Sequence, residues 1–218
     1  EKSIGLIELS SIAAGFEVAD TMLKAGNVRL LLSRSICSGK YMVLIGGETA
    51  GVEAAIAAGA EAASGCLIDS LVIANLHPDV FIAIGRTQPV QPNGALGIIE
   101  SFNVATLVRA ADAAAKAADV QLLEIRLAMA LGGKAFVTMT GDVGSVQASV
   151  AAGRAVELLS ARQFRGTGGD ADQSSGERGF VFRRRRIAAP FDRVASEFVF
   201  CVIGSVVMDA ADACAVVH

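Results

Sequence analysis

The sequence predicts an α+β fold built from two tandem domains, each with the β-α-β-β-α-β order of the ferredoxin-like arrangement, in which helices cover one face of an antiparallel sheet. The first observation is an internal repeat: residues 4–8 (IGLIE) return as residues 96–100 (LGIIE), at an offset of 92 (97 − 5). Further single residues match in order, first at 92 and then, after a slip of two, at 94. The second observation is that each copy alternates short apolar runs with helical patterns. An ordered repeat of this length indicates a duplicated domain.

The first helix is predicted from its cap and from its residue spacing. A strand at residues 3–9 is followed by Ser10 and Ser11, whose hydroxyls can accept hydrogen bonds from the first N–H groups of a helix. Apolar residues then recur at helical spacing, at Ile12, Phe16, Ala19 and Leu23. We expect the helix to end at Gly26 and Asn27, because both residue types tolerate the positive φ that often follows a helix.

The rest of the first copy follows from apolar runs and the residues that break them. We expect strands at residues 28–36, 41–45 and 67–74. Gly46 and Gly47 are expected to turn the chain. Residues 48–63 form an Ala-rich helix with acidic residues in and near its first turn, where the helix dipole favours them. Pro78 opens a short helical turn, and the first domain covers residues 1–90.

The second copy repeats this order, and we assign it residues 91–197. Its strands are expected at residues 95–101, 120–128 and 134–140, and its helices at 104–118 and from the capping residue Asp142 to about 159. Residues 160–178 are rich in Gly, Asp, Ser and Gln and predict a loop insertion. The pattern resumes at Gly179 with an offset of 114 (187 − 73), which implies 20 added residues (114 − 94). Residues 198–218 form a C-terminal extension.

Composition and charge argue against several classes of partner. A net charge of −3 and a pI of about 5.4 disfavour nucleic acid, which requires a clustered basic excess. The arginines at residues 183–186 would alternate between the two faces of a strand, which favours a solvated or interface role. The longest apolar segment, residues 198–208, is shorter than the ~20 residues that span a membrane, so we expect no membrane partner. Hydrophobic residues make up 53% and charged residues 19%, which leaves apolar surface to bury between subunits.

Cysteines and histidines suggest little chemistry within one chain. No Cys-x-x-Cys pair is present and no leader is recognised at the first residues, so we expect reduced thiols. Three cysteines lie in apolar runs and are expected in the core: Cys66, Cys201 and Cys214. The only histidines, His77 and His218, complete no Ser-His-Asp or His-rich metal set, so we expect no enzyme.

Several segments resemble the shell domain of bacterial microcompartments. They are residues 4–9 (IGLIEL), 19–25 (ADTMLKA), 33–40 (SRSICSGK), 46–48 (GGE) and 74–78 (ANLHP). The doubled domain resembles the tandem-domain shell proteins that form trimers, such as those of propanediol-utilisation microcompartments, closely over residues 3–157 and loosely over 179–194. The resemblance implies a homotrimer that imitates a hexamer. Such a trimer tiles with other microcompartment shell proteins into a shell in the bacterial cytoplasm, with a central pore for metabolite or electron passage.

The same resemblance implies that the loop between the second and third strands of each domain faces the pore, where a small metabolite or redox partner passes. The first loop contains Ser35, Ile36, Cys37, Ser38 and Gly39, and the second contains Met129, Ala130, Leu131 and Gly132. It further implies that three Cys37 thiolates hold one [4Fe-4S] cluster shared by three subunits. Ser38 departs from the proline usual after this cysteine. From the residues alone, Cys37 fits a plain thiol better than a cluster ligand, because such clusters need several thiolates and one chain offers no spacing for them.

Lys24 and Lys116 close the first helix of each copy, where the helix dipole favours a cation. The resemblance implies a second role for both, as edge lysines that pack against their mates in neighbouring tiles. It places His77, which precedes Pro78, near the same edge, although His77 also fits a strand-end residue without chemistry. The fold suits a different class of function as well, a ferredoxin-like small-molecule-binding or regulatory oligomer without a shell role.

Overall fold

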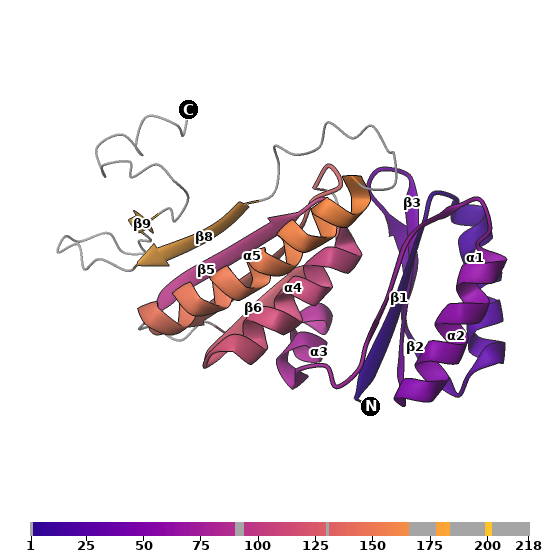
Figure 1. Cartoon of the computed structure of the whole chain (residues 1–218), viewed down its shortest axis with the longest axis horizontal. Helices are drawn as coiled ribbons and strands as arrows, with labels where there is room; N and C mark the ends of the chain where they lie inside the picture. Colours follow the sequence, from indigo (N-terminus) through magenta and orange to yellow (C-terminus); the bar gives the residue numbers. More distant parts are fainter. Residues whose placement is uncertain (1, 90–93, 130, 166–177, 184–198, 202–218) are drawn as a thin grey trace.

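The computed structural model describes residues 2–89, 94–129, 131–165, 178–183 and 199–201, which form two α+β domains in succession (Figure 1). The elements, in chain order, are β1 (Ser3–Leu9), α1 (Ile12–Ala25), β2 (Val28–Ile36), β3 (Lys40–Gly47), α2 (Thr49–Ala62), β4 (Leu67–Ile73), α3 (Pro78–Gly85), β5 (Ala95–Ser101), α4 (Val104–Ala117), β6 (Val120–Arg126), β7 (Ala135–Gly141), α5 (Val143–Arg165), β8 (Arg178–Arg183) and β9 (Val199–Cys201). Both domains have the predicted order.

The predicted fold class is confirmed by the pairing of the strands. The first sheet has the order β2-β3-β1-β4 and the second β6-β7-β5-β8-β9, with every neighbouring pair antiparallel. The central strands β1 and β5 have the predicted bounds. The short strand β9 was not predicted, and it adds a fifth strand beside β8.

The register of β8 corrects the predicted size of the insertion. Leu96 pairs with Phe182 as Ile4 pairs with Ile73, so the structural offset is 109 (182 − 73) and the second copy gains 15 residues (109 − 94) instead of 20. Helix α5 continues to Arg165, so the first part of the expected loop at 160–178 is helical. Of the remaining expectations, residues 166–177, residues 184–198 and the C-terminal extension beyond residue 201 lie outside the described residues.

Gly26, which follows α1, is needed for close packing and not for a positive φ. Gly26 has a φ of −142°, an extended conformation, and a Cβ there would lie 2.3 Å from the carbonyl oxygen of Gly51. Gly46 and Gly47 do not turn the chain, because both pair with neighbouring strands on either side of β3. At the start of α1, Ser11 accepts from the N–H of Ala14 as predicted.

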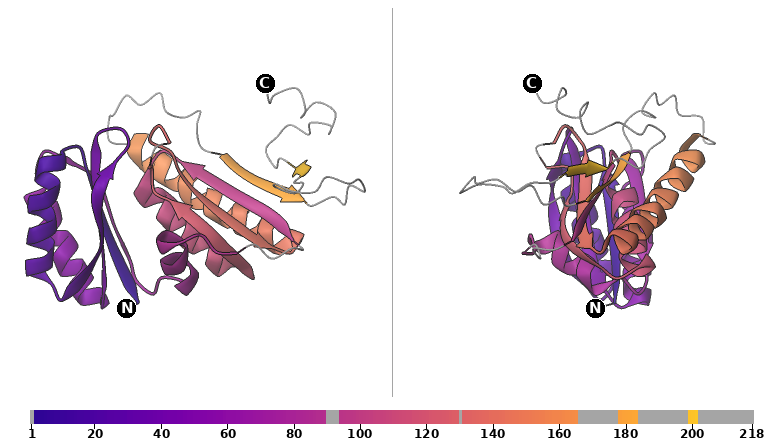
Figure 2. Two further views of the ribbon diagram at one scale, coloured as in Figure 1. Left: turned by 180° about the vertical axis from the view of Figure 1, so that it is seen from behind. Right: turned by 90° about the vertical axis from the view of Figure 1, so that its left-hand side faces the viewer.

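A shared core joins the two domains. In Figure 2, α1 and α2 lie on one side of the first sheet and the second domain lies on the other. Every residue of β1 is buried as a result. Its alternate side chains enter two cores: Ile7 packs with Val18 and Met22, whereas Leu6 packs with Leu107 and Val108 of α4. Helix α4 therefore covers the face of the first sheet that the first domain's own helices leave open.

Candidate functional site

The two predicted pore loops lie against each other. The backbone N–H of Cys37, which follows β2, donates to the carbonyl oxygen of Ala128, which follows β6, at 2.9 Å. In the first loop Ile36 is buried and Cys37 is half-buried, while Ser35, Ser38 and Gly39 are exposed. The Cys37 thiol is therefore partly covered. One chain thus places both loops at a single location.

The second loop presents apolar side chains at its tip. Met129 and Leu131 are both exposed, Gly132 lies beside them, and Ala130 falls outside the described residues. The turn glycines of the two loops are equivalent, since Gly39 has a φ of +78° and Gly133 a φ of +91°. Both occupy the left-handed region that favours glycine. The sequence repeat therefore extends to the backbone conformation of these turns.

A metal cluster held by one chain is not built into this part of the molecule. Among the described residues, no group of three or more His, Cys, Asp or Glu side chains is placed to hold a metal ion. Cys37 is a half-buried thiol in its loop, and Cys66, expected in the core, is half-buried with its thiol donating to the carbonyl oxygen of Ala63. A thiolate ligand such as Cys37 fits an iron–sulfur cluster only when other copies supply the remaining ligands.

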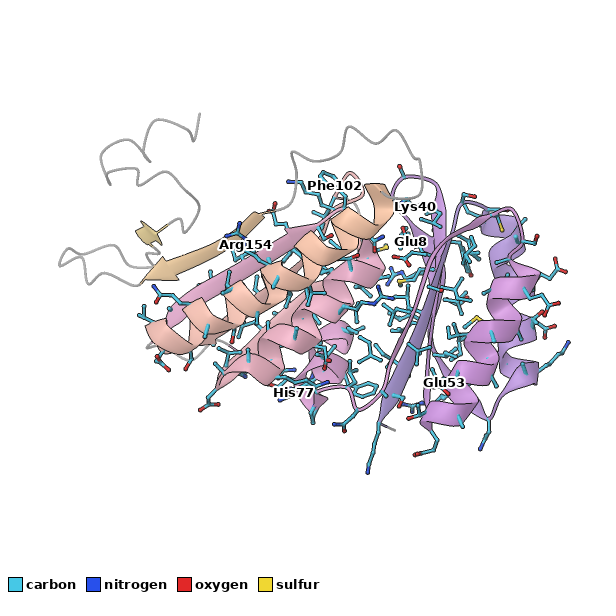
Figure 3. All side chains as sticks on the ribbon, viewed as in Figure 1. Glu8, Lys40, Glu53, His77, Phe102 and Arg154 are labelled. Atoms are coloured by element: carbon cyan, nitrogen blue, oxygen red, sulfur yellow. The ribbon has the colours of Figure 1, made fainter. Side chains whose placement is uncertain are left out.

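Each sheet carries an ion pair beside its loop, which sequence reasoning missed. Figure 3 shows Glu8 and Lys40 side by side next to the second domain, with Lys40 Nζ 2.7 Å from Glu8 Oε1. The equivalent pair is Glu100 with Lys134, at 3.1 Å. Each pair joins the first strand of a domain to the start of the third, since Lys40 is the first residue of β3 and Lys134 immediately precedes β7. Their recurrence at the repeat offsets was the signal that could have identified them. Lys40, the residue after the Cys37 loop, thus directs its charge at a carboxylate.

The predicted edge residues fall into two groups. Lys116 pairs with Asp112 at 2.6 Å, and Asp112 also accepts the backbone N–H of His77 at 2.8 Å. His77 in turn accepts from the N–H of Asp79 and precedes α3, so it has a helix-capping role. Lys24 pairs with Asp20 on α1, and both of these side chains are well exposed. The structure therefore connects Lys116 with His77 through one carboxylate, while Lys24 stays at the surface of the first domain.

The second sheet has one open face, the face opposite to α4 and α5. The equivalent face of the first sheet is covered by α4. Along β5 the half-exposed side chains alternate with buried ones, and they are Leu96, Ile98 and Glu100. The equivalent residues of β1 are all fully buried, and they are Ile4, Leu6 and Glu8. The difference follows from position, because the helices that pack on β5, α4 and α5, cover its other face, while α3 contacts the edge strand β6.

Helix α1 carries the complementary uncovered surface. Three of the four residues of its predicted apolar stripe are exposed, with Phe16 at 65%, and these three are Ile12, Phe16 and Leu23. The helix packs on its own domain through Gly15, Val18, Ala19 and Met22. The approach is close at Gly15, where a Cβ would lie 2.2 Å from the Tyr41 ring. The equivalent residues of α4 are buried against the first sheet, and they are Val104, Val108 and Ala115.

Comparisons with known proteins agree with the repeat. The BMC domain family matches residues 3–76 and 95–164. The bacterial microcompartment shell protein PduT of Citrobacter freundii is 37% identical over 198 residues, which cover 91% of this chain and 98% of that protein. The carboxysome shell protein CsoS1B of Halothiobacillus neapolitanus is 38% identical over 89 residues, covering 39% of this chain and 80% of that protein.

Solved structures give the same result. A microcompartments protein from Desulfitobacterium hafniense DCB is similar with a TM-score of 0.67 and 51% identity, covering 74% of this chain and 89% of that one. A fused permuted hexameric shell protein from the RMM microcompartment reaches a TM-score of 0.56 at 22% identity, which supports the fold alone. Within the described residues, no helix combines the length and apolar character needed to cross a bilayer.

Proposed function

The chain belongs to the BMC domain family, and from this premise we propose that it is a structural shell protein of a bacterial microcompartment, assembled as a homotrimer. The family inferred from the residues is thereby confirmed. The trimer is a pseudohexameric tile that packs with other microcompartment shell proteins into a shell in the bacterial cytoplasm. Its role is structural and not enzymatic.

The observation that carries this proposal is the pair of complementary uncovered surfaces. Helix α4 sits on the open face of the first sheet, whereas Leu96 and Ile98 on the second sheet stay partly exposed, and Phe16 on α1 stays exposed, in the described chain. Placing α1 of one copy on the second sheet of the next would repeat the contact between domains inside the chain. Such a head-to-tail contact closes into a ring when its rotation permits. A ring of six domains needs three copies.

This arrangement would bring the loops of all three copies to one axis. The Cys37–Ala128 hydrogen bond holds the two loops of each chain together. Three copies would then surround the axis with six loops, which alternate between those of Cys37 and those of Met129 and Leu131. We propose that they line a pore for a small metabolite or redox partner.

A shared [4Fe-4S] cluster is the finer part of the proposal. Three Cys37 side chains, one from each copy, would supply soft thiolate ligands of the kind that iron–sulfur clusters select. When bound, the cluster would supply one-electron transfer across the shell. The chain's own contribution is to hold each thiol in place through the backbone bond to Ala128 and the Lys40–Glu8 pair that follows the loop.

Electron microscopy of the concentrated protein tests the shell role. We expect flat sheets or tubes made of threefold tiles. Dispersed particles of constant size at all concentrations would contradict the shell role, and would favour the ferredoxin-like small-molecule-binding or regulatory oligomer.

A further inference from the structure

The two equivalent ion pairs differ in their exposure to solvent. Glu8 is fully buried and Lys40 is 27% exposed, whereas Glu100 and Lys134 are 29% and 42% exposed. The pairs have the same position in their sheets, since Glu8 lies opposite Met42 in the register and Glu100 lies opposite Phe136. What differs is the covering element: the second domain lies over the first pair, whereas the second pair stays partly exposed in the described chain.

The buried pair shows what covering does to such a carboxylate. Oxygen Oε1 of Glu8 accepts from Lys40 at 2.7 Å, while Oε2 is buried without a hydrogen-bond partner. Lys40 is therefore the partner that compensates the charge of Glu8. A buried carboxylate without its cation is strongly unfavourable, whereas removal of both charges is often neutral or stabilising.

We propose that the Glu100–Lys134 pair is buried beneath α1 of a second copy when the ring closes, and that Lys134 is required for this contact because it neutralises Glu100 there. This inference rests on the proposed trimer. Lys134 is already positioned to neutralise Glu100 in the single chain, since its ammonium lies 3.1 Å from Glu100 Oε2 and 5.6 Å from the centre of the Phe102 ring.

The incoming helix offers no substitute cation in the equivalent part of its surface. Glu17 of α1 occupies the position that Arg109 occupies in α4 (109 − 17 = 92). In the contact within the chain, Arg109 donates to the carbonyl oxygen of Ser70 on β4. An acidic residue at this position adds negative charge to the surface that would approach Glu100, which increases the dependence on Lys134.

The pair is half-exposed in the single chain and would be buried only in the assembly, so its removal should act on association and not on folding. We expect Lys134→Met to raise the dissociation constant of the trimer about a hundredfold, because it leaves Glu100 to be buried alone. Glu100→Gln should have a smaller effect. The double variant Glu100→Gln/Lys134→Met should return to within about tenfold of the wild type.

Sedimentation of fluorescently labelled protein, from nanomolar to micromolar concentration, measures these constants. Lys2→Met is the matched control, since it makes the same Lys→Met change at an exposed lysine just before β1, far from the pair in sequence. It should leave the dissociation constant of the trimer unchanged. Thermal unfolding of each variant in its monomeric state should match the wild type.

Two outcomes separate this inference from the proposed function. A wild type that remains monomeric overturns the trimer and this inference with it. A wild-type trimer that Lys134→Met leaves equally tight overturns this inference alone. It would mean that another group compensates Glu100, and Arg178, opposite Glu100 in the register, is the residue to test next. A double variant as weak as Lys134→Met would also overturn it.

Discussion

The backbone N–H of Cys37 donates to the carbonyl oxygen of Ala128 across 2.9 Å, so the loop of the first domain is fastened to the loop of the second. Cys37 and Ala128 belong to equivalent turns of the two domain copies, and the first is the donor and the second the acceptor of this hydrogen bond. The contact makes the two loops one structural unit. Any change that separates the domains would therefore also displace Cys37.

Removal of the cation beside Glu8 should destabilise the fold. Lys40→Met leaves a fully buried carboxylate without compensation, and we expect it to lower the free energy of unfolding by about 3 kcal/mol. Glu8→Gln/Lys40→Met should recover most of this loss. Chemical denaturation measures both, with Lys2→Met as the exposed control. A Lys40→Met protein as stable as the wild type would show that the pair contributes nothing.

The exposed edge lysine should affect tiling and not trimer formation. Lys24 and its partner Asp20 are both well exposed, so Lys24→Ala should change the free energy of unfolding by less than about 1 kcal/mol. We expect trimers of unchanged mass that no longer form sheets in electron micrographs. Sheets that form as readily as those of the wild type would remove Lys24 from the edge contact.

The cluster prediction depends on Cys37. Anaerobic reconstitution with iron and sulfide should give the optical and spin-resonance signals of a [4Fe-4S] cluster in the wild type and none in Cys37→Ser. Cys66→Ser is the matched control and should keep the signals, because its thiol is engaged with Ala63 in another part of the first domain. Signals that persist in Cys37→Ser would move the ligands to the other cysteines. No signal in any of the proteins would leave Cys37 a plain thiol.

The cap of α5 should make stability depend on pH in the acid range. Hydrogen bonds from the side chain and backbone of Ser145 and from the N–H of Gly144 hold the pKa of Asp142 below its usual value of 3.8. A lowered pKa in the folded state stabilises the fold above the unfolded-state pKa, and this contribution is lost as the pH falls through the folded value.

Asp142→Ala should therefore lower Tm at neutral pH, and its difference from the wild type should disappear in strong acid. Glu48→Ala is the matched control, because Glu48 precedes α2 without a side-chain capping bond. Thermal scans across the acid range measure both variants. A difference that does not change with pH would contradict the assignment to the ionised carboxylate.

Much of the fold was predictable because the repeat supplies two observations of each element. The strands β1 and β5 and the cap at Ser11 follow from apolar runs and polar breaks that occur at the same places in both copies. The register of β8 was not predictable in this way. Its residues are apolar or basic and match the first copy at several offsets, and only pairing with β5 selects one of them.

The surfaces of α1 were also beyond sequence reasoning. Apolar spacing identified Phe16 as part of a stripe, but spacing does not distinguish a core within the chain from a contact between chains. Gly15 and Met22 lie on the inner face of α1. Gly15 packs closely against the Tyr41 ring, and Met22 packs closely against Gly59 of α2. The Glu8–Lys40 pair was missed because its two residues are 32 positions apart and each alone is an ordinary charged residue.

Native mass spectrometry of the wild type and of Phe16→Asp tests the central claim most directly, that α1 of one copy covers the second sheet of the next. We expect a wild-type particle of three times the 22.3 kDa chain mass at micromolar concentration, and a folded monomer for Phe16→Asp. Ile82→Asp also replaces an exposed apolar residue with aspartate, but on α3, and this variant should remain a trimer. A monomeric wild type, or a Phe16→Asp trimer as tight as the wild type, would contradict it.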